Sequence, residues 1–164
     1  YKLHNKMMLI NKKYIALCLM LLFTACGFNV VNQKNLLNFK ITEINVTGDN
    51  RVNFLLKNKL NIYKNNNKNK LVKINLNTNI SKQIKERNIK NEITKYQINI
   101  NTNIEFTVSN TLKPITFTIS EQGNYDVAEK PSNTLNNEKK LIKILVDNIS
   151  TQVVDNLIAR VNEL

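Results

Sequence analysis

The residues best placed to do chemistry surround Cys26. An apolar run at 14–23 follows the basic pair Lys12-Lys13, and Thr24-Ala25 separates that run from the cysteine. A basic start, about 7–15 apolar residues and small residues before a cleavage point are typical of a secretory signal peptide. With a cysteine at that point, the layout is that of a bacterial lipoprotein signal. The predicted chemistry is acylation of the Cys26 sulfur after removal of residues 1–25.

Lipid on Cys26 would tether everything that follows to a membrane. Each buried CH₂ of an acyl chain contributes about 0.8 kcal/mol, so a multiply acylated cysteine anchors a protein firmly. The alternative is an N-terminal membrane anchor with an incidental cysteine, but the apolar run is shorter than the ~20 residues of a comfortable span. Because Met7 or Met8 could be the true start, residues 1–6 are expected to lie upstream of it. The absence of Asp just after Cys26-Gly27 favours the outer membrane.

The sequence after Cys26 lacks the usual catalytic side chains. The one His is His4, and the only other Cys is Cys18, which lies in the apolar run and would leave with it. Without His or a free thiol, the usual general base, nucleophile and zinc ligands are missing. The carboxylates are dispersed, and no phosphate-binding loop or nucleophile elbow occurs. We therefore expect no enzyme activity, no metal, no cofactor and no structural disulfide.

The positive net charge has two explanations, an anionic partner and the base composition of the genome. The formal charge is +12, and four lysines but no acidic residue precede Cys26, which leaves +8 on residues 26–164. A basic domain tethered on the periplasmic side favours an anionic partner such as phosphorylated lipid headgroups, and that compartment excludes nucleic acid. An AT-rich genome favours Lys, Asn and Ile codons and would produce the same charge, and runs such as Asn65-Asn66-Asn67 fit that explanation equally well.

Alternation of apolar and polar residues predicts the central strands. A first strand covers 39–46, with a change of phase around Glu43 that indicates a bulge. Two long stretches at 72–80 and 96–108 alternate apolar residues with Lys, Asn and Thr. Alternation of this length is typical of an antiparallel sheet with one solvated face.

A fourth strand and its connections follow from the same pattern. Residues 82–94 are polar and basic, and we expect them to connect the two long strands. The fourth strand is predicted at 115–120. Gln122-Gly123-Asn124 follows it, and Tyr125 and Val127 would prolong the sheet edge.

Helical spacing predicts two amphipathic helices. Apolar residues recur every three or four positions from Val52 to Tyr63, after Asp49 or Asn50 as N-cap. A longer helix is expected to begin at Pro131-Ser132 and to run nearly to the C-terminus. It carries a broad apolar stripe over 135–161 and a charged opposite face.

The order of these elements is β-α-β-β-β-α. Four strands and two helices in this order predict an α+β two-layer sandwich, in which a four-stranded, mostly antiparallel sheet carries both helices on one face. Residues 26–164 have the length of one small domain, so we expect a single domain there.

This layout resembles the LptE family, the lipopolysaccharide-assembly lipoproteins of Gram-negative outer membranes. Cys26-Gly27-Phe28-Asn29-Val30 looks like the start of the mature family members, and Tyr96-Gln97-Ile98-Asn99-Ile100 looks like their central strand. Residues 125–138 look like the passage from the last strand into the final helix, and 156–161 are similar to the end of that helix. Architecture and element order carry more of the resemblance than any motif.

The resemblance implies a partner, a ligand and a location. Such proteins sit as a plug in the lumen of the outer-membrane β-barrel LptD. They are lipid-anchored there, facing the periplasm and the barrel lumen, help the barrel assemble and bind lipopolysaccharide. The family's basic ligand-binding position lies near the turn before the central strand, where this sequence offers Lys85, Arg87 and Lys90. The resemblance does not choose among them, and a solvated basic loop is the alternative.

Two other functions remain open. A structural lipoprotein that pilots another envelope machine, such as a secretion ring, would share the anchor and the size. A tethered hydrolase would need a pair of cooperating carboxylates, and the sequence presents no such pair.

Overall fold

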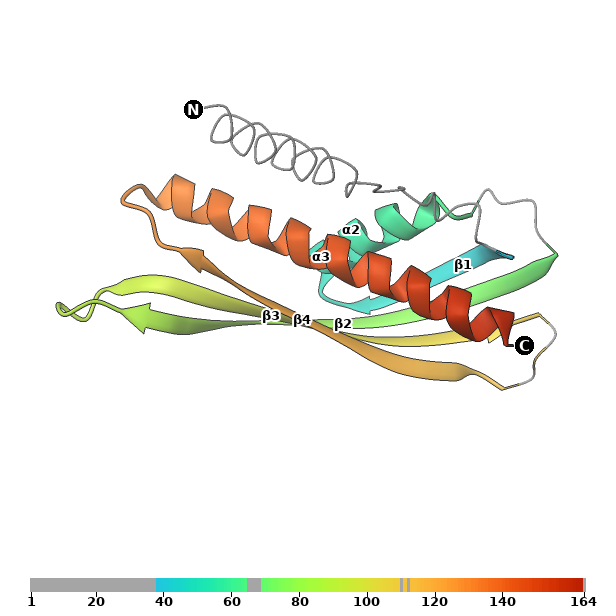
Figure 1. Cartoon of the computed structure of the whole chain (residues 1–164). Coiled ribbons are helices and arrows are strands. Elements are labelled where there is room, and N and C mark those ends of the chain that lie inside the picture. The colour runs from blue at the N-terminus through green and yellow to red at the C-terminus, as the bar shows by residue number, and fades with distance from the viewer. Residues whose placement is uncertain (1–37, 65–68, 110, 112, 164) are drawn as a thin grey trace, which may run out of the picture. The chain divides into compact units, whose positions relative to one another are not determined.

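Segments far apart in the sequence meet on one four-stranded sheet, and both helices cover the same face of it (Figure 1). The computed structural model describes residues 38–64, 69–109, 111 and 113–163. Cys26 and the predicted signal peptide at 1–25 lie outside the described residues and stay predictions. Lys34–Leu164 is a compact unit by itself. Because the whole described core belongs to this unit, we expect it to fold without the residues before Lys34.

The elements follow in the predicted order β-α-β-β-β-α. Their bounds are β1 Phe39–Gly48, α2 Asn50–Asn61, β2 Lys70–Arg87, β3 Ile93–Val108, β4 Ile115–Asp126 and α3 Pro131–Asn162. The strands lie side by side in sequence order, with β1 parallel to β2 and the other two pairs antiparallel. Helix α2 supplies the crossover that a parallel pair requires. The predicted α+β sandwich with a mostly antiparallel sheet is confirmed.

A tight corner joins β1 to α2. Gly48 has a φ of 96°, and a side chain there would collide with the carbonyl oxygen of Thr78 on β2. Asp49 then caps the helix, since its carboxylate accepts a hydrogen bond from the backbone N–H of Val52 at 2.8 Å. Of the two caps that the sequence offered, Asp49 is the one used.

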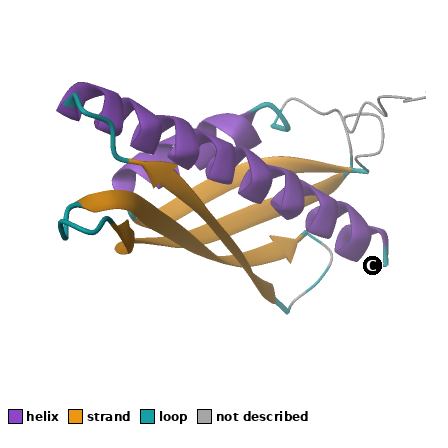
Figure 2. Cartoon of the chain, turned by 60° about the vertical axis from the view of Figure 1, so that its left-hand side comes forward, coloured by secondary structure: helices purple, strands orange, loops and turns teal. Residues whose placement is uncertain are grey.

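The helix-facing side of the sheet forms the core. Alternate residues of the strands pack under α2 and α3, and α3 buries one stripe as it crosses the strands (Figure 2). The largest fully buried side chains are Phe39, Phe106, Ile41, Leu56, Leu60, Ile74, Leu76, Ile98, Ile100, Ile104 and Ile142. A polar pair lies in this layer: the Thr78 hydroxyl donates to Asn53 Oδ1 at 2.7 Å, which gives the buried hydroxyl and the amide oxygen a partner.

The opposite side of the sheet is solvated and rich in amides. The Asn75 amide donates to Glu105 at 2.9 Å, and the Asn45 amide donates to Asn75 Oδ1 at 3.1 Å. On the other edge, the Thr118 hydroxyl donates to Asn103 Oδ1 at 2.8 Å. These side chains bridge neighbouring strands, so the predicted solvated face is confirmed and is cross-linked by its own hydrogen bonds.

The second and third strands are longer than predicted. Residues 82–94 were expected to connect two strands, but β2 continues to Arg87 and β3 begins at Ile93. Every side chain of 81–90 is exposed, so the apolar alternation that reveals a strand is lost there. Backbone pairing with β3 keeps this part extended.

The irregular points of the sheet have separate causes. The predicted bulge in β1 is confirmed by a register shift between Ile41 and Glu43. The fourth strand, predicted at 115–120, continues through 122–124 to Asp126, so that Tyr125 lies in β4 and Val127 lies just beyond its end. Helix α3 comes close to Gly123 of β4: a Cβ at this position would lie 2.6 Å from Leu141 Cδ1, so a larger residue would displace the end of that leucine side chain.

Candidate functional site

The three predicted ligand-binding residues lie at one end of the sheet. Lys85 and Arg87 belong to the last part of β2, and Lys90 lies in the turn 88–92 that leads into β3. All three side chains are exposed. We call residues 82–95 the basic hairpin, because they contain five Lys or Arg and two Glu residues. The structure therefore gathers the three predicted residues on one hairpin.

The turn of the basic hairpin is held by its own hydrogen bonds. Asn88 Oδ1 accepts from the backbone N–H groups of Lys90 at 2.9 Å and Glu92 at 3.0 Å. Asn91 adopts the left-handed conformation with a φ of 63°, and its carbonyl accepts from the Arg87 guanidinium at 2.8 Å. Arg87 is thus partly committed to the turn. Within the described residues, no hydrogen bond or ion pair engages the ammonium groups of Lys85 and Lys90.

Apolar side chains stand among these charges. Ile89, between Arg87 and Lys90, is fully exposed at 104%, and Ile84 on β2 is 47% exposed. An exposed isoleucine on an ordered turn, flanked by cations, suits an amphiphilic ligand with an anionic headgroup. A phosphate of such a ligand would contact the cations, and its hydrocarbon would contact the isoleucine.

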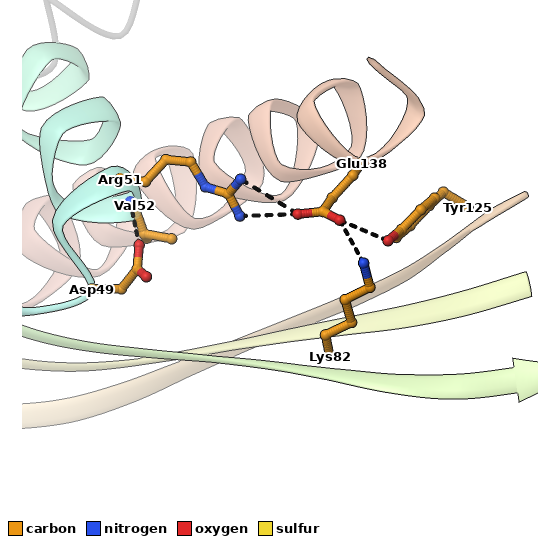
Figure 3. Close-up of polar contacts among 6 residues, drawn as sticks. All are labelled: Asp49, Arg51, Val52, Lys82, Tyr125 and Glu138. Carbon is orange, nitrogen blue, oxygen red and sulfur yellow. Dashed lines mark hydrogen bonds and ion pairs between the residues drawn. The ribbon is translucent and has the colours of Figure 1, made fainter. Parts of the chain in front are cut away.

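Glu138 on α3 ties the base of the basic hairpin to both helices (Figure 3). Its Oε2 accepts from the Lys82 ammonium and from the Tyr125 hydroxyl, each at 2.7 Å, and its Oε1 lies 3.4 Å from the Arg51 guanidinium. The Lys82 ammonium also lies 4.2 Å from the ring centroid of Tyr96. These five residues come from α2, β2, β3, β4 and α3, so they join every described element except β1.

Both charges at the centre of this network are stabilised. Burial alone would raise the pKa of Glu138, but the hydrogen bonds from Lys82 and Tyr125 outweigh it and lower that pKa. Burial would likewise lower the pKa of Lys82, yet its hydrogen bonds with Glu138 and Tyr125 raise it. The pKa of Tyr125 is raised chiefly by burial. Lys82 is therefore a paired cation that positions the hairpin.

Sequence reasoning did not identify this network, although both charges break a pattern. Lys82 takes the core-facing position that follows Ile80 in the alternation of β2. Glu138 takes a position on the apolar stripe of α3, between Leu135 and Ile142. A charge at each of two core-facing positions was the available signal. Leu135, which the predicted stripe included, is 48% exposed, and the buried residues of α3 begin at Ile142.

The described residues form neither a metal site nor a membrane-spanning helix. Within the described ranges, no group of three or more His, Cys, Asp or Glu side chains is placed to hold a metal ion. No helix of the same ranges is long and apolar enough to cross a membrane. The expectation that the protein is not an enzyme stays a prediction.

Comparison with known proteins gives a match at the level of structure. No family model and no curated protein matches the sequence. A candidate lipoprotein from Caulobacter crescentus is 10% identical, with a TM-score of 0.54, over 81% of this chain and 97% of that one. This likeness shows that the two chains share a fold.

Two further solved structures are similar at lower TM-scores. Rare lipoprotein B from Shewanella oneidensis is 10% identical, with a TM-score of 0.44, over 74% of this chain and 93% of that one. Lipoprotein B from Nitrosomonas europaea is 10% identical, with a TM-score of 0.46, over 83% of this chain and 93% of that one.

Proposed function

We propose that this chain is an outer-membrane lipoprotein of the LptE type. In this proposal it plugs and helps assemble an LptD-like β-barrel, and it binds lipopolysaccharide during delivery to the outer leaflet. Three observations support the proposal: the signal that ends at Cys26, the fold shared with the Caulobacter candidate lipoprotein, and the basic hairpin. The proposal that the ligand is lipopolysaccharide rests on the basic hairpin.

The hairpin suits the lipid end of lipopolysaccharide, which combines phosphates with acyl chains. Lys85 and Lys90 offer exposed ammonium groups, and Arg87 retains donors beyond the one it gives to Asn91. Ile89 adds an apolar contact between two of these cations. Because the turn is already ordered by Asn88, little conformational entropy would be lost on binding.

The solvated face of the sheet suits the lumen of a barrel. Barrel interiors are polar, and amide side chains can both donate and accept hydrogen bonds. Asn45, Asn75 and Asn103 project from three neighbouring strands on this face. Such a face could pair with a polar lining without first removing many charges from water.

The ligand is tested by neutralising the hairpin. The variant Lys85→Gln/Arg87→Gln/Lys90→Gln removes three exposed charges without touching the core. We expect it to weaken lipopolysaccharide binding at least about tenfold, because hydrogen bonds to charged groups contribute roughly 1.5–3 kcal/mol each when well formed. Binding of the unchanged protein should also weaken as salt rises, and the variant should show a smaller salt dependence.

A matched control distinguishes the effect of the hairpin residues from the effect of a lower net charge. The variant Lys57→Gln/Lys113→Gln/Lys140→Gln loses the same formal charge at positions on α2, on the β3–β4 connection and on α3. We expect it to bind nearly as well as the unchanged protein. Equal binding by both triple variants across the salt series would exclude the hairpin as the ligand site.

The barrel partner is tested in cells. A tagged chain, extracted in mild detergent, should co-purify with a large outer-membrane β-barrel. Its depletion should impair lipopolysaccharide export. Recovery as a monomer beside an intact barrel, or normal export with a secretion defect, would instead favour the pilot function.

A further inference from the structure

A groove between the two helices lies outside the basic hairpin. It has a volume of about 510 Å³ and is lined by Asn50, Arg51, Phe54 and Leu55 of α2 and by Lys139, Ile142 and Lys143 of α3. Sites for small molecules have volumes of about 300–1,000 Å³. The volume of the groove is therefore that of a small-molecule site.

The floor and wall of the groove are apolar without being covered. Ile142 is buried at its base, and Leu55 packs against the core. Phe54 forms a wall and is 66% exposed, which makes it the most exposed aromatic side chain of the described residues. Leaving a phenylalanine in water is unfavourable, because burying its apolar surface yields about 25 cal/mol per Å².

The rim of the groove is cationic. Lys139 and Lys143 are four residues apart on α3, so they share one side of the helix and repel each other. Arg51 approaches from α2. No carboxylate lines the groove: α2 contains no acidic residue, and Glu138 is directed to Lys82 and Tyr125. Arg51 reaches Glu138 only at 3.4 Å and keeps a side chain that is 45% exposed.

We propose that this groove binds the acyl chain of a single lipid whose phosphate headgroup is held by Lys139, Lys143 and Arg51. The hydrocarbon covers Phe54, and the phosphate relieves the repulsion between the two lysines. Charge complementarity selects an anionic headgroup, and the size of the groove selects one chain. The proposal uses different residues from the basic hairpin and does not depend on the proposed function.

The test uses dodecyl phosphate below its micelle concentration and residues 34–164, which form a compact unit by themselves. Calorimetric titration and methyl NMR shifts of Leu55 and Ile142 would report binding. We expect saturable binding of dodecyl phosphate, and binding at least about tenfold weaker for inorganic phosphate and for dodecyl maltoside. Each of these lacks one half of the recognised chemistry.

Matched variants locate the site. Phe54→Ala and Lys139→Gln/Lys143→Gln should each weaken dodecyl phosphate binding about tenfold. Ile144→Ala and Lys140→Gln, which change an exposed apolar residue and a lysine outside the groove, should leave it unchanged. The hairpin variant Lys85→Gln/Arg87→Gln/Lys90→Gln should also retain it, so the two sites fail independently.

Three results would overturn the proposal. One is no saturable binding of dodecyl phosphate. Another is an equal loss of binding for Lys140→Gln and for Lys139→Gln/Lys143→Gln, which would indicate general attraction to charge. The third is binding at Phe54 of an acidic amphipathic peptide but not of dodecyl phosphate, which would assign the groove to a protein partner.

Discussion

Glu138→Gln is the substitution that tests the network at the base of the hairpin most sharply. Glutamine keeps the shape and one oxygen acceptor but removes the charge that faces Lys82, Tyr125 and Arg51. We expect residues 34–164 to unfold more easily at neutral pH, while the fold is retained. The link between the basic hairpin and α3 should also weaken, because the Lys82–Glu138 ion pair joins them.

The size of the effect follows from exposure. A hydrogen bond to a charged group contributes roughly 1.5–3 kcal/mol when it is sheltered from water. The Glu138 side chain is 15% exposed, but that of Lys82 is 42% exposed, so water screens much of this pair. Arg51 at 3.4 Å adds little. We therefore expect Glu138→Gln to lower the free energy of unfolding by about 1–2 kcal/mol at pH 7.

The pH dependence has a defined sign. The folded pKa of Glu138 lies below its ordinary value of 4.5, so the stability from its charge is present above that value and lost as pH falls through the folded pKa. The folded pKa of Lys82 lies above its ordinary value of 10.5, so its share is present below that value and lost as pH rises through the folded pKa. The contribution should therefore form a plateau between about pH 5 and pH 10.

Urea unfolding followed by circular dichroism gives the required comparison. Glu129→Gln, an exposed carboxylate with the same change of charge, is the control and should stay within about 0.5 kcal/mol of the unchanged protein. The difference between Glu138→Gln and the unchanged protein should shrink as the pH is lowered from 4.5 through the folded pKa of Glu138. A difference that stays constant over the whole acid range in which the protein remains folded would refute the reasoning, as would an effect at pH 7 no larger than that of Glu129→Gln.

Two further predictions concern the N-cap of α2 and the predicted lipid attachment at Cys26. Asp49→Ala should lower the free energy of unfolding by about 1 kcal/mol, because it removes the acceptor for the Val52 N–H, whereas Asn50→Ala should change it by less than about 0.5 kcal/mol; equal effects in urea unfolding would contradict the cap assignment. Cys26→Ser should mislocalise the protein in fractionated cells without lowering the thermal stability of the domain, because the predicted lipid lies outside the core; a large loss of stability against the same unlipidated chain would contradict this.

The candidate site shows where sequence patterns stop being informative. Alternation revealed β3 over its whole buried length, because its inward residues from Ile98 to Val108 are buried while most of the residues between them are exposed or half-buried. Alternation did not reveal the end of β2. The side chains of 81–90 are all exposed there, so polar residues occupy both faces of the strand. The sequence therefore predicts a connection between strands for Lys85, Arg87 and Lys90, whereas Lys85 and Arg87 belong to β2.

The network and the groove depended on contacts between distant residues. Lys82 and Glu138 are separated by 56 positions, and either charge alone resembles an ordinary surface charge. The groove needs Phe54 and Lys143 to face each other across α2 and α3, and no local pattern records the packing of two helices.

The amino-acid sequence by itself determined the order of the elements and the faces that they bury, because periods of two and of three to four residues act locally. The prediction of lipid attachment at Cys26 likewise comes from the sequence alone, because it depends on consecutive residues at 12–26. Only the tertiary structure decided which cations are paired and which remain exposed. That outcome depends on distances between strands and helices, and such distances are set when the whole core packs.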